Sequence, residues 1–202
     1  MTDPMRTYAD DGFYIHPKPL LDADLVRAAT SGMDSIRAGV YDTGTEPMPS
    51  PWKPGDDPQI LCKIELPQRA STAIGSLVSD QRLGELAAKV TGADWVQVWW
   101  VQLLYKPPTP PKPGVNVGWH QDRQYWSAWE EGSELFTAWV ALSDVAENSG
   151  PMRFVPGSHQ WGLLGEGDFF GQDLSSQRQN MRLPERAQWR EEVPAILPPG
   201  GV

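Results

Sequence analysis

Residues 118–126, with the sequence GWHQDRQYW, decide how the rest of this chain is interpreted. Within this stretch His120 and Asp122 stand two positions apart. In a β-strand, side chains at positions i and i+2 point to the same face, so the imidazole and the carboxylate would project side by side. Two adjacent ligands of one metal ion need that arrangement. The pair also occurs by chance in many chains, so the hypothesis of a metal site depends on the residues around it.

A site with imidazole and carboxylate ligands, and open positions for substrate and oxygen, is typical of non-haem Fe(II) oxygenases and requires a second histidine. The chain has three histidines. His159 is one candidate, although a histidine in a turn after a strand more often holds a loop by hydrogen bonds. His16, between Ile15 and Pro17, is a weaker candidate.

Other chemistries find little support in the sequence. It contains no Gly-x-Ser-x-Gly elbow, no P-loop and no Gly-x-Gly-x-x-Gly fingerprint, and its scattered acids do not select a glycosidase pair. The only cysteine, Cys62, excludes an internal disulfide, and its apolar flanks predict a buried strand residue.

The composition predicts one soluble domain, residues 1–202. Seventeen basic and 26 acidic residues give a net charge of −9, which argues against nucleic acid or an anionic membrane as partner. The polar N-terminus is unlike a targeting peptide, and no apolar run is long enough to cross a bilayer. We therefore expect a cytoplasmic protein.

Twenty prolines and 19 glycines favour many short elements, and hence an all-β or α+β fold. Helical periodicity predicts helices over residues 22–38 and 80–90, separated by a proline-rich loop over 41–58 and a following strand. Apolar runs predict strands over residues 60–66, 95–106, 136–142 and 152–155. A turn is expected at 147–150, a polyproline-like excursion at 107–113, and an exposed loop or lid over 162–190.

The strand over 95–106, WVQVWWVQLLYK, is apolar on both faces and is therefore expected in the middle of a sheet. Gln102 would then be a buried amide that needs hydrogen-bond partners. Those partners are either structural groups or a polar ligand.

Three blocks of the sequence resemble the phytanoyl-CoA dioxygenase family of Fe(II)- and 2-oxoglutarate-dependent oxygenases. The blocks are YADDGFYI at 8–15, GWHQDRQYW at 118–126 and TAWVALSDVAENSGPMRFVPGSHQWG at 137–162. The resemblance covers nearly the whole chain. It implies a double-stranded β-helix, or jelly roll, with packed N-terminal helices, which agrees with a mostly β, α+β pattern.

The resemblance also implies roles for individual residues. His120 and Asp122 would be the first two iron ligands, and Gln102 would contact 2-oxoglutarate or substrate. Lys63 and Trp139 fall where some relatives contact the cosubstrate, although a solvated lysine and a core tryptophan are the alternatives. His159 corresponds to a family turn that supplies no ligand.

The end of the chain departs from the family pattern. The family has a third ligand histidine and a 2-oxoglutarate-binding arginine beyond a Pro-Gly turn, whereas this chain ends ILPPGGV at residues 196–202. We therefore expect a jelly roll whose C-terminal strands are missing, either as a partial chain or as a pseudoenzyme.

The resemblance implies a dioxygenase that uses Fe(II), 2-oxoglutarate and O2 to hydroxylate a small organic substrate. Asp122 argues against a halogenase, where a small residue replaces the carboxylate. Residues 123–126, which follow the ligands, are candidates for the substrate side. The alternatives are a Trp-rich jelly-roll binding module without redox chemistry, and a cupin-like isomerase or non-catalytic relative.

Overall fold

The computed structural model describes residues 3–108, 114–130 and 132–202. Its helices are α1 (Pro4–Asp11), α2 (Ala23–Arg37), α3 (Thr72–Val78), α4 (Gln81–Thr91) and α5 (Leu174–Asn180). Its strands are β1 (Cys62–Glu65), β2 (Gln102–Tyr105), β3 (Arg153–Phe154) and β4 (Val193–Pro194). Short 3-10 turns cover residues 67–69, 122–125, 147–149 and 158–161.

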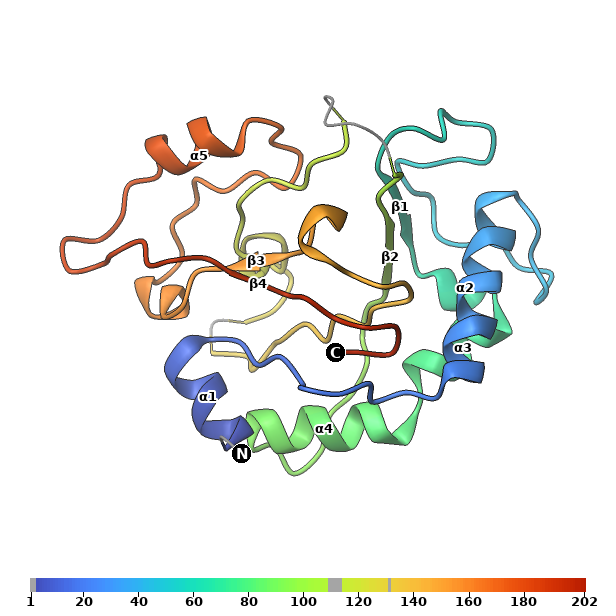
Figure 1. Ribbon diagram of the computed structural model, residues 1–202, viewed down its shortest axis with the longest axis horizontal. Coiled ribbons are helices and arrows are strands. Elements are labelled where there is room, and N and C mark those ends of the chain that lie inside the picture. The colour runs from blue at the N-terminus through green and yellow to red at the C-terminus, as the bar shows by residue number, and fades with distance from the viewer. Residues whose placement is uncertain (1–2, 109–113, 131) are drawn as a thin grey trace.

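Helices α2 and α3 pack together beside the β1–β2 pair (Figure 1). The apolar residues of α2 recur on one face, and that face is buried together with residues of α3, β1 and β2, as amphipathic spacing requires. We call this cluster the helical core; its main members are Val26, Ala29, Met33, Ile36, Cys62, Ile64, Ile74, Leu77 and Leu103. The predicted helices over 22–38 and 80–90 are confirmed as α2 and α4, and the strand over 60–66 is confirmed in shortened form as β1.

Strands β1 and β2 pair antiparallel, with Ile64 opposite Leu103 and Glu65 opposite Gln102. Because side chains alternate along a strand and direct partners share a face, the pair has two chemically different faces. Ile64 and Leu103 enter the helical core. Lys63, Glu65 and Gln102 therefore project from the opposite face.

Cys62 is fully buried in the helical core, as the sequence predicts. Burial raises the pKa of its thiol to about 11, and the nearby Arg37 guanidinium offsets only part of that effect. A thiol of this kind stays protonated at neutral pH and is a poor nucleophile.

A second apolar cluster joins the middle of the chain to the C-terminal segment. It contains Ala141, Val145, Ala195 and Leu197, and we call it the C-terminal cluster. Ala141 and Val145 exchange backbone hydrogen bonds with the segment 197–201. Gly200 also accepts hydrogen bonds from Leu20 and Leu21; its φ of 79° and the Leu21 carbonyl, 2.8 Å from where a Cβ would stand, require glycine.

The prediction of a long central strand over 95–106 is wrong in most of its length. Only Gln102–Tyr105 forms a strand, and Trp95 is 76% exposed. A strand needs a partner for its backbone groups, and β1 supplies one only opposite 102–105, with one further bond from Leu66 to Val101. Gln102 is consequently exposed, so the prediction of a buried amide is also wrong.

The predicted strand over 136–142 is likewise not formed, because its backbone meets the C-terminal segment only near Ala141. The predicted strand over 152–155 is confirmed in part as β3, and the turn at 147–150 is confirmed. The predicted lid over 162–190 contains α5. The polyproline excursion at 107–113 lies largely outside the described residues.

The described strands form two separate two-stranded sheets and do not close into a barrel.

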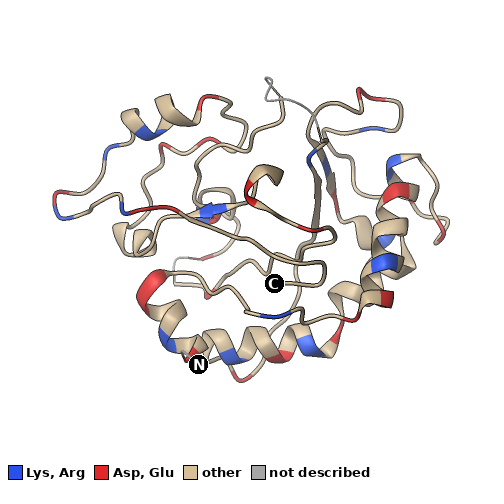
Figure 2. Ribbon diagram, viewed as in Figure 1, with Lys and Arg blue, Asp and Glu red and all other residues tan. Residues whose placement is uncertain are grey.

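Charges of both signs are interspersed along α2 and α4, and the view in Figure 2 shows no large basic patch. Among the described residues, no helix is both long enough and apolar enough to cross a membrane.

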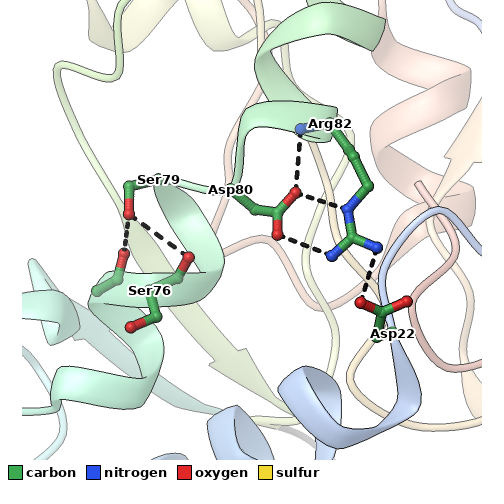
Figure 3. Close-up of polar contacts among 6 residues, drawn as sticks. Asp22, Ser76, Ser79, Asp80 and Arg82 are labelled. Atoms are coloured by element: carbon green, nitrogen blue, oxygen red, sulfur yellow. Dashed lines mark hydrogen bonds and ion pairs between the residues drawn. The ribbon is translucent and has the colours of Figure 1, made fainter.

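Asp80 lies between α3 and α4 (Figure 3). Its side chain is connected through Arg82 to Asp22, the residue before α2. Its carboxylate accepts a hydrogen bond from the Arg82 backbone N–H at 3.0 Å, which caps the N-terminus of α4. The same carboxylate binds the Arg82 guanidinium at 2.8 Å, and that guanidinium also pairs with Asp22 at 2.9 Å. The hydrogen bonds from Arg82 outweigh the effect of burial and lower the pKa of Asp80.

We predict that Asp80→Ala lowers the free energy of unfolding by about 1 kcal/mol at pH 7, the usual effect of removing a helix cap. Asp80→Asn keeps an oxygen acceptor for the helix N-terminus and should lose less stability than Asp80→Ala. Because folding lowers the pKa of Asp80, its ionised carboxylate stabilises the folded protein above the ordinary aspartate pKa of about 4. This stabilisation is lost as the pH falls through the folded-state pKa. Urea unfolding of the wild type and of Asp80→Ala at pH 7 and pH 3 measures the loss of stability. An equal loss at both pH values would contradict the prediction.

Candidate metal centre

His120 and Asp122 bring their side chains together, as the sequence predicts. The His120 Nε2 atom lies 3.3 Å from the Asp122 Oδ1 atom. The predicted reason is wrong, however, because neither residue lies in a strand: Asp122 begins a 3-10 turn over Asp122–Tyr125. The two-residue spacing still brings both side chains together, and Gln121 between them has an extended backbone, with φ of −114° and ψ of 125°.

The backbone determines which nitrogen of His120 is free. The Nδ1 atom lies 2.7 Å from the Gly118 carbonyl oxygen. A carbonyl oxygen only accepts, so Nδ1 carries the hydrogen and donates it. In the neutral imidazole the Nε2 lone pair then faces Asp122 and is available to a metal ion, the usual arrangement of a histidine ligand.

Thr137 holds the other oxygen of Asp122. Its hydroxyl donates to the Asp122 Oδ2 atom at 2.5 Å. One carboxylate oxygen is therefore oriented by Thr137, while the other faces His120. The sequence reasoning missed this residue, although Thr137 opens the TAWVALSD block and lies two positions before Trp139.

Burial and hydrogen bonding act in opposite directions on the His120–Asp122 pair. Burial lowers the pKa of His120, but in the protonated ring Nε2–H donates to Asp122 and Nδ1–H donates to the Gly118 carbonyl, and these bonds outweigh burial, so the pKa is raised. A metal ion would take the place of the Nε2 proton. Burial raises the pKa of Asp122, but the hydrogen bonds from His120 and Thr137 outweigh it, so this pKa is lowered. The surroundings thus favour an ionised carboxylate, the form that binds metal.

Aromatic rings form one wall of this site. The Phe169 ring lies 5.1 Å from the His120 ring, and the Tyr125 ring lies 6.0 Å from it. The position of Phe169 follows from backbone pairing, because Gly118 N–H donates to the Phe169 carbonyl and Asp168 N–H donates to the Trp119 carbonyl. Phe169 N–H in turn donates to the Tyr125 hydroxyl. The predicted lid region therefore contributes to the site.

Lys63, on the polar face of the β1–β2 pair, reaches this aromatic wall. The Lys63 Nζ atom lies 4.6 Å from the centre of the Phe169 ring, so the lysine and His120 contact the same aromatic side chain. Lys63 pairs with Glu65 at 3.0 Å, and the Gln102 amide donates to Glu65 at 3.2 Å. The side chain of Lys63 is 15% exposed, which contradicts the alternative of a solvated lysine at a strand edge.

The other candidates lie elsewhere. Trp139 is half-buried and packs against the C-terminal cluster. His159 donates from Nε2 to the Ala9 carbonyl at 3.1 Å and so ties a turn to α1, as expected for a loop-holding histidine. Its ring stands within 2.3 Å of where a Cβ of Gly12 would be, so Gly12 makes room for it. The His16 Nδ1 atom lies 3.5 Å from the Tyr14 hydroxyl.

The residues that follow Asp122 have structural partners. Arg123 donates to the Trp129 and Glu130 carbonyls, and Gln124 donates to the Gly167 carbonyl. Tyr125 lies beside His120, so it is the member of this group that reaches the site.

A cavity of about 110 Å³ borders His120. The indole rings of Trp119, Trp161 and Trp189 help to line it, with Arg153 and Ser158 as polar members. Within residues 3–108, 114–130 and 132–202, no group of three or more His, Cys, Asp or Glu side chains converges as a metal site would require. His120 and Asp122 are therefore a pair of candidate ligands.

Comparisons with known proteins show what this chain is similar to. The sequence profile of the phytanoyl-CoA dioxygenase family matches residues 8–202. A probable alpha-ketoglutarate-dependent hypophosphite dioxygenase of Stutzerimonas stutzeri is 26% identical over 157 residues, which cover 77% of this chain and 52% of that protein. The ectoine dioxygenases of Bordetella parapertussis and Bordetella bronchiseptica are 33% and 32% identical over 133 residues, which cover 62% of this chain and 42% of each.

The chain thus spans about half the length of the curated relatives it matches. No solved structure matches it significantly.

We predict that Thr137→Val weakens Co²⁺ binding roughly tenfold, because loss of a residue that orients a metal ligand typically costs ten- to a hundredfold in affinity. The valine is similar in size but cannot donate to Asp122. Thr137→Ser keeps the hydroxyl and should bind nearly as well as the wild type. Isothermal titration with Co²⁺ measures the difference, and equal affinities for the valine and serine variants would exclude the orienting role of Thr137.

Proposed function

We propose that this chain, which belongs to the phytanoyl-CoA dioxygenase family, is an Fe(II)- and 2-oxoglutarate-dependent dioxygenase that hydroxylates a small organic substrate. The observation that carries the proposal is the convergence of His120 Nε2 and Asp122 Oδ1 within the matched region. His120 and Asp122 are its proposed iron ligands. Lys63 and Gln102 are the proposed 2-oxoglutarate contacts, with Trp139 as a third position that the family resemblance implies.

The donor set fits ferrous iron. One nitrogen and one carboxylate oxygen are two of the three ligands in the facial arrangement of non-haem Fe(II) enzymes. The His120 Nε2 and Asp122 Oδ1 atoms lie 3.3 Å apart, so both would be able to bind one ion. When bound, iron would supply the redox chemistry by which O2 oxidises 2-oxoglutarate and the substrate.

The protein residues prepare the site for that chemistry. Gly118 and Thr137 orient the two ligands, the first through Nδ1 of His120 and the second through Oδ2 of Asp122. Phe169 and Tyr125 cover the His120 ring and restrict the access of water to it. Lys63 provides an ammonium group, and Gln102 an amide, on the side from which a 2-oxoglutarate carboxylate would approach.

The same proposal includes the architecture. Family membership implies a double-stranded β-helix, of which the short pairs β1–β2 and β3–β4 are the parts formed by the described residues. We propose that residues 1–202 belong to one such domain. The cavity lined by Trp119, Trp161 and Trp189 borders His120 and offers apolar walls to a small substrate.

One observation favours a second candidate, a Trp-rich binding module without redox chemistry. Trp99 lies within ring-contact distance of Trp100, Trp126 and Trp129, and three of these four rings are more than a third exposed. Exposed aromatic rings can stack on a sugar or a similar ring. The metal and cosubstrate titration below separates the two functions, because a binding module requires neither Fe(II) nor 2-oxoglutarate.

Anaerobic addition of Fe(II) and 2-oxoglutarate should produce the weak visible charge-transfer band of this enzyme class. His120→Ala and Asp122→Ala should each abolish the band, because each removes one of the two ligands that the described residues supply. His159→Ala is the matched control: it also removes an imidazole, but one that contacts Ala9, and it should leave the band unchanged. Absence of the band in the wild-type protein, or its persistence in His120→Ala, would contradict the proposal.

A further inference from the structure

We propose that Glu65 is the positioning residue of the 2-oxoglutarate site and holds Lys63 and Gln102 in the orientation that receives a ligand carboxylate. This inference rests on the proposed function. Neither the sequence motif nor the family comparison assigns a role to Glu65.

The carboxylate of Glu65 is the centre of a polar cluster on the β1–β2 pair. Its Oε1 atom accepts from the Lys63 ammonium at 3.0 Å and from the Gln102 amide at 3.2 Å. Its Oε2 atom accepts from the Trp100 indole N–H at 2.7 Å. One side chain therefore restrains both proposed cosubstrate contacts together with a neighbouring tryptophan.

This cluster is not needed for the hydrophobic core. Glu65 alternates with Ile64, and it is Ile64 that enters the helical core. The Glu65 side chain is only 13% exposed, and burying a carboxylate is unfavourable unless it is paired and hydrogen-bonded. The carboxylate of Glu65 therefore depends on the donors that Lys63, Gln102 and Trp100 provide.

The cluster also faces the metal ligands. Phe169 connects the two, because its ring contacts both the Lys63 ammonium and the His120 imidazole. The direct partner of Glu65 across the strand pair is Gln102, so the acid and the amide share one face by register. The cluster on this face is therefore connected to His120 through Lys63 and Phe169.

Both partners keep binding capacity after they contact Glu65. An ammonium group has three N–H donors, and Glu65 occupies one of those of Lys63. A primary amide has two N–H donors and a carbonyl, and Glu65 occupies one donor of Gln102. The remaining donors can bind a ligand carboxylate while Glu65 restricts the motion of both long side chains, which reduces the entropy lost on binding.

Charge alone predicts the opposite effect of removing Glu65. A carboxylate next to Lys63 repels an incoming dicarboxylate, so its removal would tighten 2-oxoglutarate binding if only Coulomb forces mattered. If Glu65 acts by positioning, its removal weakens binding, because Lys63 and Gln102 lose their common acceptor. The sign of the change in affinity therefore distinguishes the two roles.

The experiment measures 2-oxoglutarate binding by isothermal titration in the presence of Co²⁺, with thermal unfolding as a parallel measurement. Glu65→Ala should raise the Kd for 2-oxoglutarate about tenfold, the usual scale for a lost charge-assisted hydrogen bond. Glu65→Gln keeps one acceptor oxygen and should raise the Kd severalfold; it decides the question if the alanine variant does not fold. Glu85→Ala removes a carboxylate that also accepts from a glutamine amide, on the surface of α4, and should leave the Kd unchanged.

A double mutant tests whether Glu65 acts through Lys63. In the Lys63→Ala background, Glu65→Ala should add less than its effect in the wild type, because coupled residues are not additive. An unchanged or tighter Kd in the Glu65 variants would overturn the positioning role while leaving the proposed function intact. Absence of 2-oxoglutarate binding by the wild-type protein would overturn the proposed function, and this inference with it.

Discussion

The alternation of side chains along the paired strands β1 and β2 is the constraint on which the site depends. Cys62 and Ile64 enter the helical core, so Lys63 and Glu65 must leave on the other face. The register that places Ile64 opposite Leu103 also places Glu65 opposite Gln102. A shift of one residue in either strand would bury the charges and expose the core, so the packing of α2 and α3 indirectly determines where the polar groups point.

A second set of backbone contacts brings the metal ligands to that polar face. The hydrogen bonds between residues 118–119 and 168–169 place Phe169 over His120, and the Lys63 ammonium lies over the same ring. Segments that are about a hundred residues apart in the sequence are therefore joined through one phenylalanine. This explains why the region 162–190, polar and irregular in sequence, contributes to the site.

Local signals in the sequence predicted the parts of the fold that depend on local physics. The helices α2 and α4 were predictable from apolar spacing and from an aspartate before each, although only Asp80 caps its helix with a side-chain hydrogen bond. The long strands over 95–106 and 136–142 were not, because strand formation depends on a partner segment that periodicity does not reveal. For the candidate site, His120 and Asp122 were proposed from their spacing and from the family resemblance, whereas Thr137 and Phe169 contact this pair in ways that no spacing rule encodes. Glu65 was within reach, since it lies two residues after Lys63 on a predicted strand.

The Lys63–Glu65 pair determines what kind of recognition this face can provide. Two opposite charges 3.0 Å apart largely cancel each other at a distance, so an approaching dicarboxylate meets little net attraction from Lys63. Discrimination must then come from the directions of the remaining N–H groups of Lys63 and Gln102, which favour a carboxylate that presents its oxygens in the matching geometry. Such a site gives up part of its long-range attraction for anions in general. In return the proposed cosubstrate site would distinguish one carboxylate from others by the placement of its hydrogen bonds.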